Sequence, residues 1–113
     1  KPKVITYESK WDEKSSDWAG TMNMSCPAVL TKQEKASVEE AVRKSCDALM
    51  VRDYARFDIR LKDGIPYVID YNANPAIGSK DASGLPAKKF GLTYQEFIQA
   101  IVAVAVKRQK AGV

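Results

Sequence analysis

The sequence predicts an α+β fold, an antiparallel sheet with helices on one face, within a single domain of 113 residues. β-Branched and aromatic residues between Tyr54 and Tyr71 surround an Asp63-Gly64 pair, a pattern typical of a β-hairpin. Capping boxes that begin at Thr31 and Thr93 each precede apolar residues at helical spacing. The expected order is strand, loop, helix, hairpin, loop and helix, and the chain is long enough to bury a small core.

The first half of the chain should contain one strand and one long helix. Residues 4–7 are β-branched and aromatic and predict the strand, whereas residues 12–24 are polar, include Gly20 and predict a loop. The helix should span about residues 32–49, because the Thr31 hydroxyl can cap it while Glu34 reaches back. Its apolar stripe is expected to consist of Val38, Ala41, Val42, Cys46 and Leu49.

The hairpin brings four polar side chains together only if its turn has the right length. Arg56 and Asp58 share one face of the first strand, and Asp70 and Asn72 share one face of the second. A two-residue loop would place Asp58 and Asp70 on opposite faces. A three-residue loop, residues 62–64, would pair Arg56 with Asp70 and align all four. The other face, directed at a core, would then carry Phe57, Ile59, Leu61, Ile69 and Tyr71.

The last third of the chain is expected to be a loop followed by helices. Residues 73–85 are rich in Asn, Gly, Ser and Pro and predict the loop. Pro86 can open a short helix as its first residue, and Gly91 suits its end. A final helix should follow the capping box at Thr93 and reach about Gln109. Its apolar side would consist of Phe97, Ile98, Ile101, Val102, Val104 and Ala105.

The polar face of the hairpin has the chemistry of a magnesium site. Magnesium prefers oxygen ligands and is usually held by one or two carboxylates together with substrate phosphates. Asp58, Asp70 and Asn72 meet that requirement. The alternative is a solvated surface with an Arg56–Asp70 ion pair, which contributes less than about 1 kcal/mol when exposed.

Composition excludes several classes of function. The chain has no histidine, so it can build neither a typical zinc site nor a Ser-His or Cys-His nucleophile system. The net charge of +4 is dispersed, which gives little support to nucleic-acid binding but suits phosphates or carboxylates. No apolar run is long enough to span a membrane. Cys26 and Cys46 lack metal-ligand spacing, and we expect a reducing, cytoplasmic setting.

Several stretches in the same order resemble the D-alanine–D-alanine ligase branch of the ATP-grasp superfamily. The main match is YARFDIRL, an Asp-Gly turn, and PYVIDYNANP, at residues 54–61 and 66–75. Residues 7–11, the Cys-Pro-Ala of residues 26–28, and Leu85-Pro86 with the final helix extend the similarity over most of the chain. The resemblance implies the C-terminal lobe of an ATP-grasp domain.

The resemblance implies an ATP-dependent carboxylate–amine ligase. ATP would phosphorylate a carboxylate, and an amine would attack the acylphosphate. The cofactors would be ATP and two magnesium ions, which manganese could replace. The substrates would be small, amino acid-like carboxylates and amines, with no nucleic acid or membrane as a partner.

The resemblance also implies roles for individual residues. Asp58, Asp70 and Asn72 would ligate the magnesium ions that bridge the ATP phosphates. Arg56 would stabilise charge on the transferring phosphoryl group and on the tetrahedral intermediate. Lys10 would contact phosphate from the N-terminal segment. These roles agree with phosphoryl transfer as a problem of positioning and electrostatic stabilisation.

Two further positions carry implied roles, and three positions depart from the family pattern. Ala76 occupies the place of a glycine whose backbone N–H binds the oxyanion, and Ser83 lies near the residue that binds the substrate carboxylate. Asp70 replaces a longer glutamate, Trp11 replaces a tyrosine, and Ala76 itself restricts the backbone if a positive φ is needed.

The chain resembles only the second lobe of the two between which an ATP-grasp protein holds its nucleotide. We therefore expect residues 1–113 to be a fragment of a longer protein, inactive without the missing N-terminal lobe. Two alternatives remain: a non-catalytic nucleotide-binding or regulatory module that retains the fold, and a small interaction domain that uses the hairpin face for protein contact.

Overall fold

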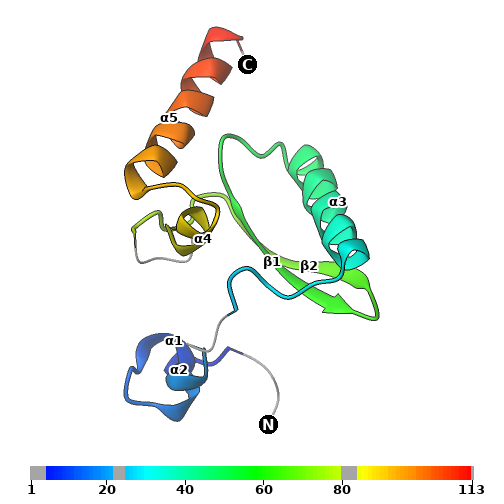
Figure 1. Cartoon of the computed structure of the whole chain (residues 1–113), viewed down its shortest axis with the longest axis vertical. Coiled ribbons are helices and arrows are strands. Elements are labelled where there is room, and N and C mark those ends of the chain that lie inside the picture. The colour runs from blue at the N-terminus through cyan, green and yellow to red at the C-terminus, as the bar shows by residue number, and fades with distance from the viewer. Residues whose placement is uncertain (1–4, 22–24, 80–83, 113) are drawn as a thin grey trace.

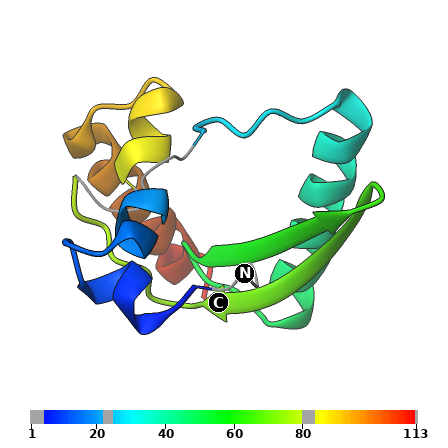
Figure 2. The same ribbon diagram turned by 90° about the horizontal axis from the view of Figure 1, so that it is seen from below.

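The computed structural model describes residues 5–21, 25–79 and 84–112, and these form three groups of elements (Figure 1). Two short helices lie at the N-terminal end, a hairpin packs with a long helix, and two further helices follow. The radius of gyration is 16.0 Å, whereas a compact domain of this length has about 13 Å. The view from below shows the hairpin with its long helix on one side of the molecule and the remaining helices on the other (Figure 2).

The N-terminal group is helical, so the strand predicted at residues 4–7 is wrong for its described part. Helix α1 (Tyr7–Trp11) is capped by Thr6, whose hydroxyl accepts a hydrogen bond from the Ser9 N–H at 3.2 Å. Helix α2 (Ser16–Thr21) lies in the stretch predicted as a loop, and the Ser15 hydroxyl accepts from the Trp18 N–H at 3.0 Å. Capping side chains therefore stabilise two helices where β-branched residues had predicted a strand and polar residues had predicted a loop.

Helix α3 (Lys32–Ala48) confirms the long helix and its capping box. The Glu34 N–H donates to the Thr31 hydroxyl at 3.2 Å, and the Thr31 N–H donates to the Glu34 carboxylate at 2.8 Å. This helix packs against the second strand of the hairpin (Figure 1). Its half-buried side chains include Val38, Ala41, Val42 and Cys46 of the predicted stripe, whereas Leu49 follows the helix and is exposed.

The hairpin consists of β1 (Arg56–Lys62) and β2 (Ile65–Asn72), joined by a two-residue turn. Lys62 pairs directly with Ile65, and both turn residues have positive φ, 53° at Asp63 and 75° at Gly64. These angles are typical of a type I′ turn, whose twist matches that of the strands. The three-residue loop, on which the expected alignment of the four polar residues depended, is therefore wrong.

A one-residue register shift nevertheless aligns the polar residues. Leu61 pairs with Pro66 and Ile59 with Val68, but Asp58 pairs with Asp70 rather than with residue 69. Ile69 is the extra residue, and its side chain is 60% exposed instead of facing a core. Because a bulge shifts the strand by one residue, it restores the alternation that the shorter turn would have broken.

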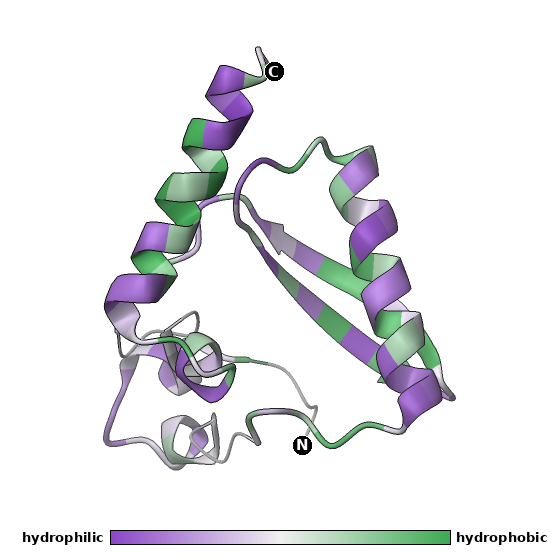
Figure 3. Ribbon diagram, turned by 45° about the horizontal axis from the view of Figure 1, so that its top comes forward, coloured by the Kyte–Doolittle hydropathy of each residue, from purple (hydrophilic) through white to green (hydrophobic). Residues whose placement is uncertain are grey.

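The apolar face of the hairpin lies opposite these polar side chains. Phe57, Ile59 and Leu61 are half buried there, and the Phe57 and Tyr71 rings lie 5.1 Å apart. Hydrophilic and hydrophobic positions alternate along both strands (Figure 3). Since α3 packs on β2 with its own apolar stripe, it covers this face.

The third group contains α4 (Gly84–Lys89) and α5 (Tyr94–Lys110). Helix α4 begins two residues before the predicted Pro86. A Cβ at Gly84 would lie 2.5 Å from the Gly78 carbonyl oxygen, so a glycine allows the start of α4 to approach the loop after β2. Gly91 ends this segment with φ of 97°, as expected.

Helix α5 confirms the second capping box, but it buries fewer apolar side chains than the sequence predicts. The Glu96 N–H donates to the Thr93 hydroxyl at 3.2 Å. Phe97, Ile98, Ile101 and Ala105 are half buried, whereas Val102 and Val104 are 55% and 48% exposed. The helix lies at one end of the molecule, where it packs with α4 (Figure 1).

Few side chains are buried in the described part of the chain. Among the described residues, Ala87 is buried at 9% exposure and Pro75 is also buried, whereas many large apolar side chains are open to solvent. Within the same described ranges, no helix has the length and apolar character needed to cross a membrane.

Candidate functional site

The candidate site is the polar face of the hairpin, built from directly paired residues on both strands. Arg56 pairs with Asn72, and Asp58 pairs with Asp70. Directly paired residues of antiparallel strands point to the same side, so all four side chains share one face. The structure thus brings together the four hairpin residues predicted from the sequence, through a register that the sequence did not predict.

Arg56 and Asp58 are tied to each other along β1. The Arg56 Nε donates to the Asp58 Oδ1 at 3.0 Å, and the two side chains are 40% and 42% exposed. The cross-strand Arg56–Asp70 pairing expected from the longer turn is wrong, because Asp70 lies opposite Asp58. Two carboxylates facing each other repel, and a bound cation would relieve that repulsion.

Asn72 is held by the segment that follows it. Its side-chain Oδ1 accepts a hydrogen bond from the Asn74 N–H at 2.9 Å. The Asn74 side-chain oxygen in turn accepts a hydrogen bond from the Tyr54 hydroxyl. An amide oxygen has two lone pairs, so the Asn72 oxygen keeps one for another donor or for a cation.

The donor set fits a hard divalent cation. Asp58, Asp70 and Asn72 offer two carboxylates and one amide oxygen on a face that is partly open to solvent. Magnesium commonly takes only one or two protein carboxylates and completes its shell with water and phosphate oxygens. Among the described residues, no group of three or more His, Cys, Asp or Glu side chains is placed to hold a metal.

Two of the other predicted site residues, Lys10 and Ala76, lie in the described part of the chain, outside the hairpin strands. Lys10 is exposed on α1, whose main packing partner is α2. Ala76 is exposed in the loop after β2 and does not have a positive φ, so its side chain costs nothing in backbone strain. Ser83 lies outside the described residues.

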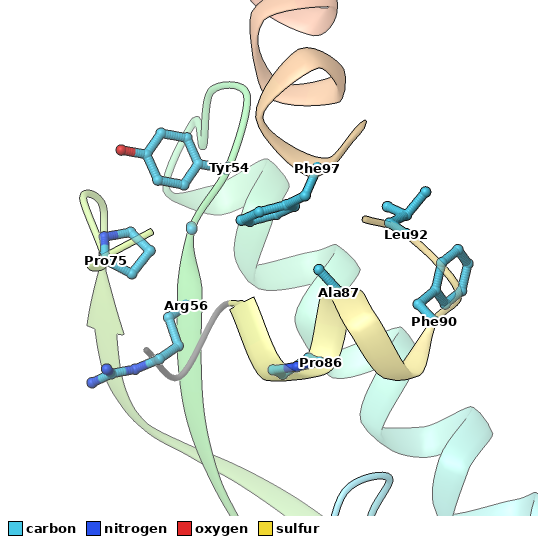
Figure 4. Close-up of a pocket in the computed structure, with 9 residues that line it drawn as sticks. Tyr54, Arg56, Pro75, Pro86, Ala87, Phe90, Leu92 and Phe97 are labelled. Carbon is cyan, nitrogen blue, oxygen red and sulfur yellow. The ribbon is translucent and has the colours of Figure 1, made fainter. Parts of the chain in front are cut away.

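An open pocket of about 440 Å³ adjoins the polar face where the hairpin approaches α4 and the start of α5 (Figure 4). The hairpin side contributes Arg56, Tyr54 and the buried Pro75. In Figure 4 the Arg56 guanidinium and the Tyr54 hydroxyl both point away from α4, so the pocket itself is mainly apolar. The α4–α5 side consists of Pro86, Ala87, Phe90, Leu92 and Phe97.

Sequence reasoning missed an ion pair between α5 and the segment that precedes β1. Arg108 on α5 donates to both carboxylate oxygens of Asp53, at 2.9 and 2.8 Å, over a separation of 55 residues. The hydrogen bonds from Arg108 lower the pKa of Asp53, and Asp53 raises the pKa of Arg108. Only the three-dimensional arrangement reveals this pair, because neither residue lies in a recognisable motif.

Known proteins resemble this chain over most of its length. Residues 1–103 match the family model described as D-ala D-ala ligase C-terminus. The D-alanine–D-alanine ligase of Cupriavidus pinatubonensis is 23% identical over 104 residues, which are 91% of this chain and 32% of that protein. The D-alanine–D-alanine ligase A of Bacillus cereus is 29% identical over 101 residues, or 89% of this chain and 31% of that protein.

A solved structure agrees with these matches. The crystal structure of the D-alanine–D-alanine ligase from Bacillus anthracis complexed with ATP has a TM-score of 0.70 and 28% identity, covering 74% of this chain and 30% of that one. The chain spans about a third of the length of the curated relatives it matches. It belongs to the family of D-alanine–D-alanine ligase C-terminal domains, the C-terminal part of the ATP-grasp fold.

Proposed function

We propose that this chain is the metal- and phosphate-binding lobe of an ATP-dependent carboxylate–amine ligase of the D-alanine–D-alanine ligase type. The observation that carries the proposal is the alignment of Arg56, Asp58, Asp70 and Asn72 on one hairpin face, in a chain of this family. A solved relative that the chain resembles was crystallised with ATP, which supports a nucleotide as the ligand.

In the proposed reaction the residues of this face hold the phosphates rather than react with them. Asp58, Asp70 and Asn72 would hold magnesium, which when bound neutralises phosphate charge. Arg56 carries a permanent positive charge beside Asp58 and would stabilise charge on the transferring phosphoryl group. An acylphosphate forms when the substrate carboxylate attacks the terminal phosphorus and ADP leaves, and an amine then displaces phosphate.

The proposal requires a complete, two-lobed protein. The described residues bury little apolar surface, and α5 leaves Val102 and Val104 exposed. A site formed by one hairpin face cannot enclose a nucleotide or exclude water from an acylphosphate. We therefore propose that residues 1–113 alone do not catalyse ligation, and that Lys10 and Ala76 reach the site only in the complete protein.

Steady-state kinetics on the complete protein that contains this chain test the proposal. ADP release is measured with Mg-ATP, with and without amino acids. We expect Asp58→Asn and Asn72→Ala to lower turnover by about a hundredfold or more, because each removes an electrostatic contact to the phosphates. Asp47→Asn, an exposed carboxylate at the end of α3, is the matched control and should leave turnover unchanged. Unchanged turnover in Asp58→Asn, with the fold intact, would contradict the assignment.

A nucleotide-binding module without turnover is the second candidate. It is favoured by Asp70, whose side chain is one methylene shorter than the glutamate of the family pattern. Calorimetric titration with Mg-ATP separates the two candidates, because the module binds ATP but releases no ADP when amino acids are added.

A further inference from the structure

The segment that enters β1 has a strained turn next to the candidate site. Asp53 has a φ of 63°, which is uncommon for a residue with a side chain. The Tyr54 N–H donates to the Arg52 carbonyl oxygen at 2.7 Å, so residues 52–54 form a three-residue turn with Asp53 at its centre. Such turns are rare, and strained residues persist only where surrounding contacts hold them.

The surrounding contacts are those of Asp53 with α5. Both of its carboxylate oxygens accept hydrogen bonds from Arg108, and the two side chains are only 15% and 32% exposed. Bidentate geometry fixes the orientation of the carboxylate as well as its position. The contact with Arg108 of α5 thereby holds the turn at Asp53, and this turn determines where the next residue, Tyr54, is placed.

Tyr54 contacts the loop after β2. Its hydroxyl donates to the Asn74 side-chain oxygen, and the Asn74 N–H donates to the Asn72 Oδ1 at 2.9 Å. The Tyr54 ring lies near Pro75, with its hydroxyl turned away from α4 (Figure 4). These two hydrogen bonds connect Tyr54 to the amide oxygen that the proposed function assigns to the metal.

We propose that Tyr54 is a positioning residue for the metal ligand Asn72. By holding the Asn74 side chain, it fixes the backbone N–H that orients the Asn72 amide oxygen toward the polar face. The inference rests on the proposed function, because it presupposes a cation at Asp58, Asp70 and Asn72. Partners beyond the ligands themselves are known to tune metal affinity by holding the ligands in place.

The test is a titration of the complete protein with Mn²⁺, followed by electron paramagnetic resonance in the presence of a non-hydrolysable ATP analogue. Tyr54→Phe keeps the ring and removes the hydroxyl. It should weaken Mn²⁺ binding about tenfold, the lower end for partners outside the ligand shell. Tyr94→Phe, which removes a hydroxyl at the exposed start of α5, is the matched control and should bind Mn²⁺ like the wild type.

A double-mutant cycle decides whether Tyr54 acts through Asn74. Asn74→Ala removes the acceptor of the Tyr54 hydroxyl but keeps the backbone N–H that contacts Asn72. If both substitutions break the same link, Tyr54→Phe with Asn74→Ala should weaken Mn²⁺ binding no more than either single substitution. Additive losses would overturn the proposed route, and unchanged Mn²⁺ affinity in Tyr54→Phe would overturn the inference.

The wild-type titration separates this inference from the proposed function. If the wild type binds no Mn²⁺ with the ATP analogue, the proposed function fails and the inference falls with it. If the wild type binds Mn²⁺ and Tyr54→Phe binds it equally well, only the inference fails. A lower unfolding temperature of Tyr54→Phe with unchanged Mn²⁺ affinity would indicate a purely structural role and would also overturn it.

Discussion

Asp53 combines an unusual backbone conformation with an ion pair to a distant helix. It adopts a positive φ without being glycine, and its side chain is held by Arg108 on α5. The hydrogen bonds from Arg108 lower the pKa of Asp53 in the folded state. A lowered pKa means that the ionised carboxylate stabilises the fold wherever it is also ionised in the unfolded chain.

This stabilisation should depend on pH in a defined direction. It is fully present above the ordinary aspartate pKa of about 3.9 and is lost as the pH falls through the lowered pKa of the folded state. Asp53→Asn should therefore lower the urea midpoint of the complete protein at pH 7, and its difference from the wild type should shrink as the pH falls below about 4. Asp47→Asn serves as the control, and a difference that does not change with pH would contradict the role of Asp53.

At the scale of single residues, the sequence located the polar residues of the hairpin face but not the residues that contact and hold them. Asp58, Asp70 and Asn72 belong to a strand pattern, and oxygen ligands can be recognised by type. Tyr54, Asn74 and Asp53 were not predicted, because a positive φ and a contact over 55 residues leave no local pattern. Ala76 was expected to restrict the backbone, yet its φ is not positive.

The hairpin is the element on which the site depends. Its two-residue turn alone would separate Asp58 from Asp70, and the extra residue Ile69 brings them back to one face. The short turn and the bulge each shift the strand register by one residue, so their effects on which face Asp58 and Asp70 occupy cancel. The polar residues lie on one face as expected, although the loop is shorter than the one that this expectation required, because side-chain alternation cannot locate a bulge inside a run of β-branched residues.

The backbone conformation of the turn can be tested directly. Gly64 has a φ of 75°, and a Cβ there would meet no atom within 4 Å, so Gly64→Ala should cost only the left-handed backbone, about 1 kcal/mol. In the complete protein this should raise amide exchange in the hairpin about fivefold. Asp63→Asn should not raise it, because asparagine is favoured in type I′ turns. Unchanged exchange in Gly64→Ala would contradict the left-handed conformation of Gly64 in this turn.

Helices were predictable where their capping residues have a clear spacing. Thr31 with Glu34 and Thr93 with Glu96 located both long helices, because a capping box satisfies backbone N–H groups that would otherwise lack partners. Helices α1 and α2 were missed. They are short, and their stability depends on contacts with each other rather than on an apolar stripe.

The whole molecule consists of three groups of elements with few buried side chains among the described residues. Its radius of gyration exceeds that of a compact domain, and apolar residues of α5 remain exposed. The sequence predicted the helices and the hairpin but not their separation, since amphipathic stripes show which side is apolar and not what covers it. The family match over residues 1–103 identifies the fold to which these elements belong.

The most direct test of the central claim is a crystal structure of the complete protein with Mn²⁺ and a non-hydrolysable ATP analogue. The proposal predicts anomalous peaks beside the analogue's phosphates, with oxygens of Asp58, Asp70 and Asn72 at coordination distances of roughly 2.0–2.2 Å. A nucleotide-bound structure in which Mn²⁺ contacts none of these three side chains would contradict it.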